Sequence, residues 1–434
     1  MLQSGNDVAM GRGSRAEIIA WTLYDWANSA YSTILITVIQ QYFKWVVFPE
    51  SAWGATAYAW GISASMITAA VLSPVVGALA DANKSKRRWL AGLVLPGAAG
   101  ALLMAFAPAS QAWLVVLLFI GTSLCFELSL GIYNAFLPEI ADESSMNRVS
   151  AWGFALGYIG GAVALILALM LTVYGPKIGL ATLEGQLRAG IAVMGVWWGV
   201  FSLPAIFVLR DRGVAAGGRQ PLVPAARKAF REVGQTLANI RRYRMVAIFL
   251  LGFLFYNEGV QTVISQASTF ATETPELKFT TNELIKLILM IQFLALPGAL
   301  AVGWASDRFG QKPALFACLA VWVMLLVAAF FVAAKWQFWI LGAVVAMVMG
   351  GTQSVSRAIM GVITPPERSA EFFGFFNFSG KATSFMGPFL FGLIFKLSGN
   401  PRLAVISLLV FFLAGWVIAG RVNLDEGRRR AKSE

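Results

Sequence analysis

Five charged side chains stand inside long apolar stretches of this chain. They are three carboxylates and two cations: Asp25, Glu127, Glu258, Arg357 and Lys381. A charge at the centre of a lipid bilayer costs about 2.5–3.5 kcal/mol on insertion scales, so each of these groups needs a partner, a wet cavity or a binding role. Opposed charges of this kind can hold the two ends of a small zwitterion, and a carboxylate can also carry a proton.

Asp25 lies in the segment YDWANSAY, residues 24–31, well inside its apolar stretch. Asn28 follows at i+3, so both side chains share one face of a helix, and Tyr24 flanks the acid. We interpret Asp25 as a ligand for a substrate ammonium group or a proton, with Tyr24 and Asn28 at the same site. The alternative is a structural carboxylate that caps an adjacent helix near the cytoplasmic mouth.

Glu258 lies near the middle of another apolar stretch, in the segment FYNEGVQTV. Asn257 stands beside it, and Gln261 follows on the same helical face. The sequence contains 0 His, so any proton carrier in this chain is a carboxylate. Glu258 is therefore a candidate for proton coupling. The alternative is a structural hydrogen-bond anchor.

Glu127 and Arg357 form a second candidate set. Asn134 follows Glu127 on one helical face, and Gln353 precedes Arg357 by four residues. The planar guanidinium of Arg357 can hold a substrate carboxylate through two hydrogen bonds. The alternative is an internal pair, in which Arg357 contacts Glu127 or another acid and holds the cytoplasmic ends of the protein together.

Lys381 completes the set of candidate charges. It shares a helical face with Asn377, four residues before it. Lys381 can neutralise an acid or contribute to anion binding, and the sequence leaves both open. A sixth charge, Lys286, is near the outer end of its stretch, where its long side chain can reach the interface, so we interpret it as structural.

The composition disfavours catalytic, metal and cofactor sites. There are 0 His and 2 Cys, which removes the ordinary Ser-His and Cys-His dyads and any Cys/His metal cluster. No GxxxxGK[ST] loop is present to hold a nucleotide phosphate. We therefore expect no cofactor and no metal, and a polytopic membrane enzyme is a poor alternative.

The positions of these charges depend on apolar elements that cross a membrane. Of the 434 residues, 58% are hydrophobic and 13% charged, whereas soluble domains carry about 25% charged residues. A spanning helix needs about 20 apolar residues. Twelve runs qualify: about 18–47, 56–80, 88–107, 112–137, 150–174, 189–209, 245–271, 283–306, 313–334, 336–362, 371–397 and 401–420. The predicted fold class is all-α and polytopic, with two pseudo-symmetric six-helix bundles.

The positive charges predict the orientation of these spans. Of the 34 Lys and Arg residues, 24 fall in the two tails, the central segment and the loops on the same side. Under the positive-inside rule both termini are cytoplasmic, in a cytoplasmic (inner) membrane. The net charge of +12 is then a record of topology, and we expect lipid rather than nucleic acid as the partner.

A central polar segment, residues 210–244, separates the two predicted bundles at 1–209 and 245–434. The front of this segment is irregular. Its back, residues 225–244, spaces four apolar residues on one helical stripe with basic residues around it; the four are Phe230, Val233, Leu237 and Ile240. This pattern predicts a basic amphipathic helix that lies on the inner leaflet.

One loop motif occurs in both halves. The first copy reads GALADANKSKRR (77–88) and the second GWASDRFGQK (303–312). Gly77 and Gly303 are 226 residues apart, and so are Asp81 and Asp307, where Arg308 follows. Glycine permits close helix approach, and the aspartate can cap a helix or pair with a cation, which suits a gate. Repeated halves are typical of secondary transporters that work by alternating access.

The second copy of this motif resembles the loop motif of the major facilitator superfamily. In the first copy, Lys84, Ser85 and Lys86 stand where that superfamily usually has a glycine and a basic pair. Further segments resemble the vacuole-effluxer branch, also called the unknown major facilitator family. They are YDWANSAY, YNAFLPEIA (133–141), VSAWGFALGYIGG (149–161), FYNEGVQTV, GGTQSVSRAIMGVITPP (350–366) and EFFGFFNFSGKATSFMGP (371–388).

This resemblance implies a function. Eukaryotic members of the branch are autophagy-related vacuolar amino-acid effluxers. It implies a monomeric secondary transporter for a small polar solute, an amino acid or similar zwitterion, with proton coupling. In this interpretation Asp25 or Glu258 meets the ammonium or the proton, and Arg357 meets the carboxylate. The alternative is a permease of the same fold for a sugar, a peptide fragment or an osmolyte.

Overall fold

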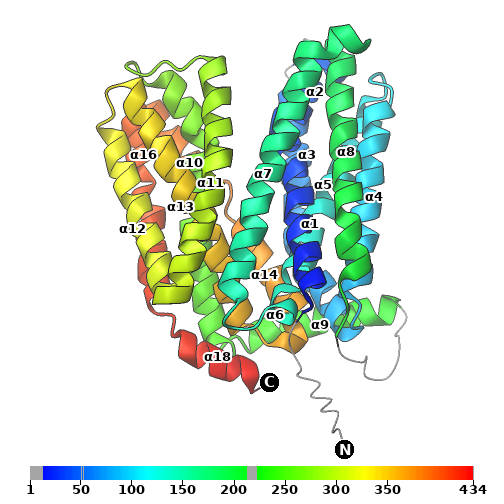
Figure 1. Cartoon of the computed structure of the whole chain (residues 1–434), viewed down its shortest axis with the longest axis vertical. Coiled ribbons are helices and arrows are strands. Elements are labelled where there is room, and N and C mark those ends of the chain that lie inside the picture. The colour runs from blue at the N-terminus through cyan, green and yellow to red at the C-terminus, as the bar shows by residue number, and fades with distance from the viewer. Residues whose placement is uncertain (1–12, 50, 52, 213–221, 434) are drawn as a thin grey trace, which may run out of the picture.

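The computed structural model describes residues 13–49, 51, 53–212 and 222–433, and these residues are helical or in turns, without a strand. The helices form two bundles that stand side by side (Figure 1). In chain order they are α1 (Arg15–Ile34), α2 (Gln40–Tyr42), α3 (Trp53–Ala82), α4 (Lys86–Phe106), α5 (Ala112–Asn134), α6 (Leu137–Ile140), α7 (Met146–Tyr174), α8 (Leu183–Val208), α9 (Leu222–Ala238), α10 (Arg244–Glu273), α11 (Thr281–Phe309), α12 (Gln311–Phe330), α13 (Lys335–Ile363), α14 (Ser369–Lys381), α15 (Met386–Ser398), α16 (Pro401–Ser407), α17 (Leu409–Gly420) and α18 (Leu424–Lys432).

In the described part of the chain, ten helices are long and apolar enough to cross a membrane. The two remaining expected spans are present as interrupted helices. The first continues from α1 through π-helical turns at Leu35–Ile39 and Phe43–Val47. The run expected over about 371–397 is divided in the structure, because turns at 382–385 separate α14 from α15. Pro388, in the first turn of α15, has no N–H to donate back to Ser384, so it favours a new helix start there.

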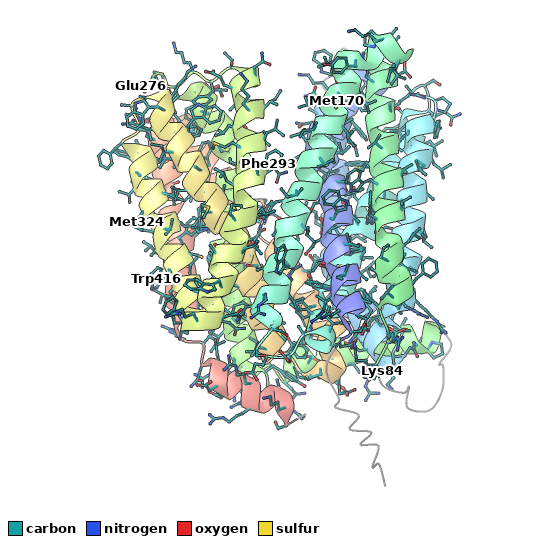
Figure 2. All side chains as sticks on the ribbon, viewed as in Figure 1. Lys84, Met170, Glu276, Phe293, Met324 and Trp416 are labelled. Carbon is teal, nitrogen blue, oxygen red and sulfur yellow. The ribbon has the colours of Figure 1, made fainter. Side chains whose placement is uncertain are left out.

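The start of α1 and the helix α18 lie at the same end of the molecule, which is the lower end in Figure 1. Figure 2 shows Lys84 at this lower end and Glu276 at the opposite end. The repeated motif belongs to this end too, but its glycine and aspartate stand in the last turns of α3 and α11 rather than in loops. The loops themselves begin after Ala82 and Phe309.

The two motif copies share an unusual backbone conformation at equivalent positions. Gly310 has a φ of 94°, and Lys84, 226 residues earlier, has a φ of 43°. Left-handed backbone costs a residue with a side chain about 1–2 kcal/mol, and glycine avoids that cost. Lys84 therefore adopts a backbone conformation that glycine adopts more easily. Its side chain also forms an ion pair with Glu367 of the other half.

We expect Lys84→Gly to be more stable than Lys84→Ala by about 1 kcal/mol. Both changes remove the ion pair with Glu367, so the comparison isolates the backbone. Thermal unfolding of the two purified variants in the same detergent measures the difference. Equal melting temperatures would show that the turn at residue 84 carries no left-handed strain.

The linker helix α9 lies against the lower end of the N-terminal half. Its buried face is made of small residues, Ala225 and Ala229, which pack on the last turns of α3. Of the predicted apolar stripe, Val233 packs against this contact, whereas Phe230 is 51% exposed and Ile240, beyond the end of the helix, is 40% exposed. The side chain of Leu237 lies outside the described part of the structure. The irregular front of the predicted linker, 213–221, and the first residues of the N-terminal tail, 1–12, lie outside the described residues.

The C-terminal helix α18 crosses the lower end beneath both halves (Figure 1). It is seated on the C-terminal half, where its Gly427 contacts Ile363 so closely that there is little room for a Cβ. Its basic side chains reach the N-terminal half: the Arg428 guanidinium lies 2.7 Å and the Lys432 ammonium 3.2 Å from Glu143. This helix therefore connects the two halves by charge.

Candidate functional site

A buried ion pair joins the two halves near the lower end. The Asp25 carboxylate of α1 lies 2.9 Å from the Arg357 guanidinium of α13. Asp25 is 6% exposed and Arg357 2%. Asn28 donates a hydrogen bond to the other carboxylate oxygen of Asp25 at 3.3 Å. Of the partners considered for Arg357, the structure selects Asp25 rather than Glu127.

The remaining N–H groups of Arg357 are engaged as well. Its Nε donates to the hydroxyl of Ser150 at 3.0 Å, and one terminal nitrogen donates to the Ser150 carbonyl at 2.8 Å. The other terminal nitrogen also donates to the Asn134 side chain at 3.2 Å. The guanidinium lies 4.1 Å from the ring centre of Phe154 and 4.6 Å from that of Trp21. In this conformation Arg357 therefore has little capacity left for a substrate carboxylate.

Gly153 of α7 makes room for this ion pair. A Cβ on Gly153 would lie 2.7 Å from a terminal nitrogen of Arg357 and would also overlap the carboxylate of Asp25. The sequence did not lead us to Ser150 and Phe154 as contacts of Arg357; both lie within one helical turn of Gly153. The available signal was the glycine spacing in VSAWGFALGYIGG, which marks the stretch of α7 on which α1 packs.

A second ion pair between the halves lies at the junction of α5 and α14. The Lys381 ammonium is 3.2 Å from one carboxylate oxygen of Glu127, and the Lys381 side chain is 31% exposed. Asn377, one turn before Lys381, donates to the Glu127 backbone carbonyl at 2.8 Å. The second carboxylate oxygen of Glu127 is buried and has no hydrogen-bond partner among the described residues. The Glu127–Lys381 pair is thus more exposed to solvent than the Asp25–Arg357 pair, and fewer of its polar atoms have hydrogen-bond partners.

Glu258 stands where the eleventh span is broken. One of its carboxylate oxygens accepts the backbone N–H of Gly387 at 2.7 Å, and the other accepts the hydroxyl of Thr383 at 3.3 Å. The neighbouring Asn257 donates to the Gly380 carbonyl at 3.1 Å. A carboxylate at the N-terminus of a helix is favoured by the helix dipole. Glu258 therefore makes the contacts of a hydrogen-bond anchor for α15, whatever else it does.

The other predicted site residues fall into different places. Tyr24 is fully buried and donates to the Ser129 hydroxyl of α5 at 2.7 Å, inside its own half. Gln353 accepts a hydrogen bond from Tyr158 across the halves at 2.8 Å. Gln261 is exposed on α10, one turn after Glu258. The twelve candidates thus do not form one cluster: the two ion pairs join the halves, whereas the Glu258 contacts lie within the C-terminal half.

At the lower end, the first copy of the motif contacts the other half directly. A Cβ on Gly77 would overlap the carbonyl oxygen of Ala370 at the start of α14. Asp81 accepts the backbone N–H of Glu371 at 2.9 Å and lies 3.2 Å from the Lys86 ammonium. Both interactions considered for this aspartate, a helix cap and a cation pair, are therefore present.

Lys86 is the residue of this region that the sequence reasoning undervalued. It is 4% exposed and pairs with Glu139 as well as with Asp81. Its ammonium also donates to the hydroxyl of Ser369 in the other half. The departure of the first motif copy from the usual pattern thus leaves a basic residue at this contact between the halves.

The second copy makes related but weaker contacts. A Cβ on Gly303 would overlap Ala151 of α7. Asp307 accepts from the side chain of Asn147 at 3.1 Å and lies 3.7 Å from the exposed Arg148. Arg308 lies 5.8 Å from the ring of Trp304 on its own helix. The lower ends of the two halves are therefore closed on each other at two pseudo-equivalent places.

Comparison with known proteins gives consistent results. Residues 54–432 match the family described as "Vacuole effluxer Atg22 like". The chain is 33% identical over 405 residues to an uncharacterized MFS-type transporter, YxiO, of Bacillus subtilis, covering 92% of this chain and 93% of that protein. It is 26% identical over 304 residues to Autophagy-related protein 22-1 of Penicillium rubens, covering 65% of this chain and 50% of the fungal protein. The match thus spans about half the length of such fungal relatives.

Solved structures share the fold at low sequence identity. The major facilitator transporter FucP in its outward conformation superimposes with a TM-score of 0.70 at 15% identity, covering 94% of this chain and 100% of that one. The proton:xylose symporter XylE, bound to 6-bromo-6-deoxy-D-glucose, has a TM-score of 0.72 at 12% identity, covering 96% of this chain and 97% of that one. These likenesses show the major facilitator fold, with which twelve spans are consistent, and carry no information on cargo.

Proposed function

The chain belongs to the vacuole effluxer Atg22-like family of major facilitator transporters, and from that premise we propose that its cargo is a small zwitterion such as an amino acid. The protein is a multi-pass membrane transporter for a small molecule and not an enzyme. The choice of cargo, the coupling to protons and the direction of export belong to the proposal.

The Glu127–Lys381 pair is the observation that carries this proposal. A zwitterion has the same two charges as the pair, so its ammonium can replace Lys381 at Glu127 while its carboxylate replaces Glu127 at Lys381. The free carboxylate oxygen of Glu127 and the partly exposed Lys381 side chain support such an exchange. No net charge is added or removed from the buried site, which limits the desolvation penalty.

The positions of the contacts between the halves support a mechanism of alternating access. Asp25–Arg357 and the Asp81–Lys86–Ser369 contacts hold the lower ends together. We propose that the lower end faces the cytoplasm, because most Lys and Arg residues are predicted on this side. The conformation described here is then closed toward the cytoplasm, and both sets of contacts separate when it opens.

Glu258 is our candidate for the proton site. As a carboxylate it accepts the N–H of Gly387 in the first turn of α15, and protonation would remove the negative charge that favours this contact. The freed segment, residues 382–385, directly follows Lys381. Protonation of Glu258 would therefore shift the cation that holds Glu127, which links proton and cargo through one short segment.

The cargo assignment is tested with Lys381→Met and Glu127→Gln in proteoliposomes, by exchange of a radiolabelled amino acid across the membrane. Each variant is expected to lose about 2–5 kcal/mol of binding to the zwitterion, which abolishes measurable exchange. Lys286→Met, which removes an exposed lysine from α11, is the matched control and should exchange normally. Exchange by Lys381→Met at the rate of Lys286→Met would refute the proposed site.

The same vesicles test the proton site. Glu258→Gln should keep exchange, which needs no net proton movement, and lose accumulation driven by a pH gradient. Accumulation that persists in Glu258→Gln would assign the proton to another carboxylate. Exchange of a labelled sugar but no amino acid would support the alternative permease.

A further inference from the structure

Two helices that belong to neither bundle also join the halves. They are α9, which is part of the linker, and α18, which follows the last span, and both lie at the lower end of the molecule (Figure 1). The pairs Asp25–Arg357 and Glu127–Lys381 connect one bundle directly to the other. The helices α9 and α18 instead lie outside the bundles, and each of them contacts both halves.

The first part of α9 packs on the N-terminal half. Its Ala225 and Ala229 form an apolar cluster with Val75, Ala78 and Leu79 of α3. Both alanines are buried, at 5% and 2% exposed. Because this contact is apolar, its strength does not depend on pairs of charges that salt can screen.

The last turn of α9 is bound to the C-terminal half instead. Thr236, which is 3% exposed, donates to the Glu371 carboxylate of α14 at 2.7 Å and accepts from the Arg368 guanidinium. Arg368 and Glu371 form an ion pair at 2.6 Å, and Arg368 also donates to the Tyr243 hydroxyl at 2.6 Å. A single helix of 17 residues therefore reaches from one half to the other.

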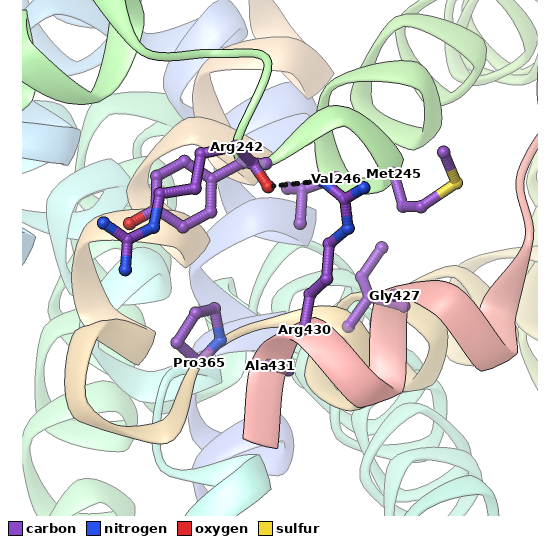
Figure 3. Close-up of a pocket in the computed structure, with 9 residues that line it drawn as sticks. Arg242, Met245, Val246, Pro365, Gly427, Arg430 and Ala431 are labelled. Atoms are coloured by element: carbon purple, nitrogen blue, oxygen red, sulfur yellow. Dashed lines mark hydrogen bonds between the residues drawn. The ribbon is translucent and has the colours of Figure 1, made fainter. Parts of the chain in front are cut away.

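The turn that follows α9 is held by α18. The Arg430 guanidinium donates to the backbone carbonyls of Arg241 at 3.4 Å and Arg242 at 3.1 Å, beside a small pocket between α18 and the start of α10 (Figure 3). The helix α18 is itself seated on the C-terminal half, where the backbone N–H of Asn423 donates to the Met245 sulfur at 3.3 Å. The two helices outside the bundles are thus connected to each other.

The helix α18 returns to the N-terminal half at one acid. Glu143, in the segment between α6 and α7, lies 2.7 Å from the Arg428 guanidinium and 3.2 Å from the Lys432 ammonium. The Glu143 side chain is 41% exposed, so salt screens both pairs. The contacts therefore run from α3 through α9 to the C-terminal half, and from there through α18 back to the N-terminal half.

We propose that α9, the turn after it and α18 together form a strap that stabilises the conformation closed at the lower end, and that Glu143 is the residue where it fastens to the N-terminal half. The strap rests on the proposed alternating access of the halves, but not on which cargo the protein carries. Opening of the lower end has to break a contact of α9 and a contact of α18. The exposed Glu143 pairs are weaker than the buried Thr236 network, so they are the weakest part of the strap.

The test measures how fast a cysteine at the closed lower end reacts with a thiol reagent. The reporter is Ser73→Cys, at a position that is 4% exposed, in a full chain whose Cys125 and Cys318 are replaced by alanine. Glu143→Gln should raise the labelling rate about two- to fivefold at low salt, because it removes only exposed ion pairs. Thr236→Val keeps the shape of the side chain but removes its hydroxyl from a buried network, and should raise the rate about tenfold.

Asp425→Asn is the matched control. It also removes an acid that pairs with Arg428, at 3.4 Å, but this pair lies within α18 and not between the halves. Labelling should therefore stay at the rate of the reporter chain. At high ionic strength the Glu143→Gln effect should disappear, because the pairs are then screened in the reporter chain too, whereas the Thr236→Val effect should remain. Thermal unfolding confirms that each variant is folded at the labelling temperature.

Unchanged labelling in both Glu143→Gln and Thr236→Val would overturn the strap, and so would an effect of Asp425→Asn equal to that of Glu143→Gln. Asp25→Ala in the same reporter chain separates this result from a failure of alternating access. Faster labelling in Asp25→Ala alone would mean that the lower end opens but is not held by α9 and α18. Unchanged labelling in all three variants would contradict both the strap and the opening of this end.

Discussion

An Asp25→Ala variant is expected to lose transport and to leave the conformation that is closed at the lower end. The change leaves the buried Arg357, of which 2% is exposed, without its negatively charged partner. Removing one partner of a buried ion pair costs about 3–5 kcal/mol. That cost falls only on the closed conformation, because opening the lower end gives Arg357 access to water. Thermal unfolding and exchange in proteoliposomes measure the two effects.

Two further variants make this expectation specific. The double variant Asp25→Asn/Arg357→Gln removes both charges, so it should recover much of the stability that Asp25→Ala loses while remaining inactive. Glu276→Gln is the matched control: it breaks a partly exposed pair with Arg402 at 2.9 Å and should change stability by no more than about 1 kcal/mol. If Asp25→Ala behaves like Glu276→Gln, the buried pair does not hold the closed state.

The second large effect is expected from Gly77→Ala. The added Cβ would overlap the backbone carbonyl of Ala370, and backbone cannot move aside as a flexible side chain can. The lower end should therefore fail to close, and transport should be lost. A cysteine placed at Ser73, which is 4% exposed in the closed state, should react with a membrane-impermeant thiol reagent faster in this variant than in the wild type.

Gly92→Ala is the control for this change. Gly92 lies in α4 with nothing within 4 Å of an added Cβ, so the substitution should be neutral or stabilise by about 0.5–1 kcal/mol through helix propensity. Both variants make the same chemical change in a membrane helix. Normal transport by Gly77→Ala would mean that the α3–α14 contact adapts easily, and would remove Gly77 from the gate.

The fold was predictable because long apolar runs and their charge-bearing loops report directly on spanning helices. The break at residues 382–385 was not, since the whole stretch 371–397 holds enough apolar residues to count as one span and only Pro388 indicates a new helix start. The contact between α9 and α3 was not predicted. The apolar stripe of α9 indicated a face toward the membrane, whereas the alanines that pack on α3, Ala225 and Ala229, carry no sequence signal of their own.

The charged residues of the candidate site could be predicted from the sequence, but the pairs that they form could not. An intramembrane charge needs a partner, which identified Arg357 and Asp25 from the sequence. These residues are 332 positions apart, and their contact depends on how the two bundles pack against each other. The same applies to Lys381 with Glu127. Local sequence carries no information on docking, except where a glycine such as Gly153 marks a place of close approach.

Because the eleventh span is broken, α14 has a fixed point of its own, at its start. Its start is held by Gly77 and Asp81 of the N-terminal half, although the chain assigns α14 to the C-terminal half. Beyond the break, α15 is hydrogen-bonded to Glu258 of its own half. If the two halves rock against each other as we propose, we therefore expect the moving parts to divide at the four residues after Lys381 rather than at the linker 210–244. The motion would then displace the cation beside Glu127.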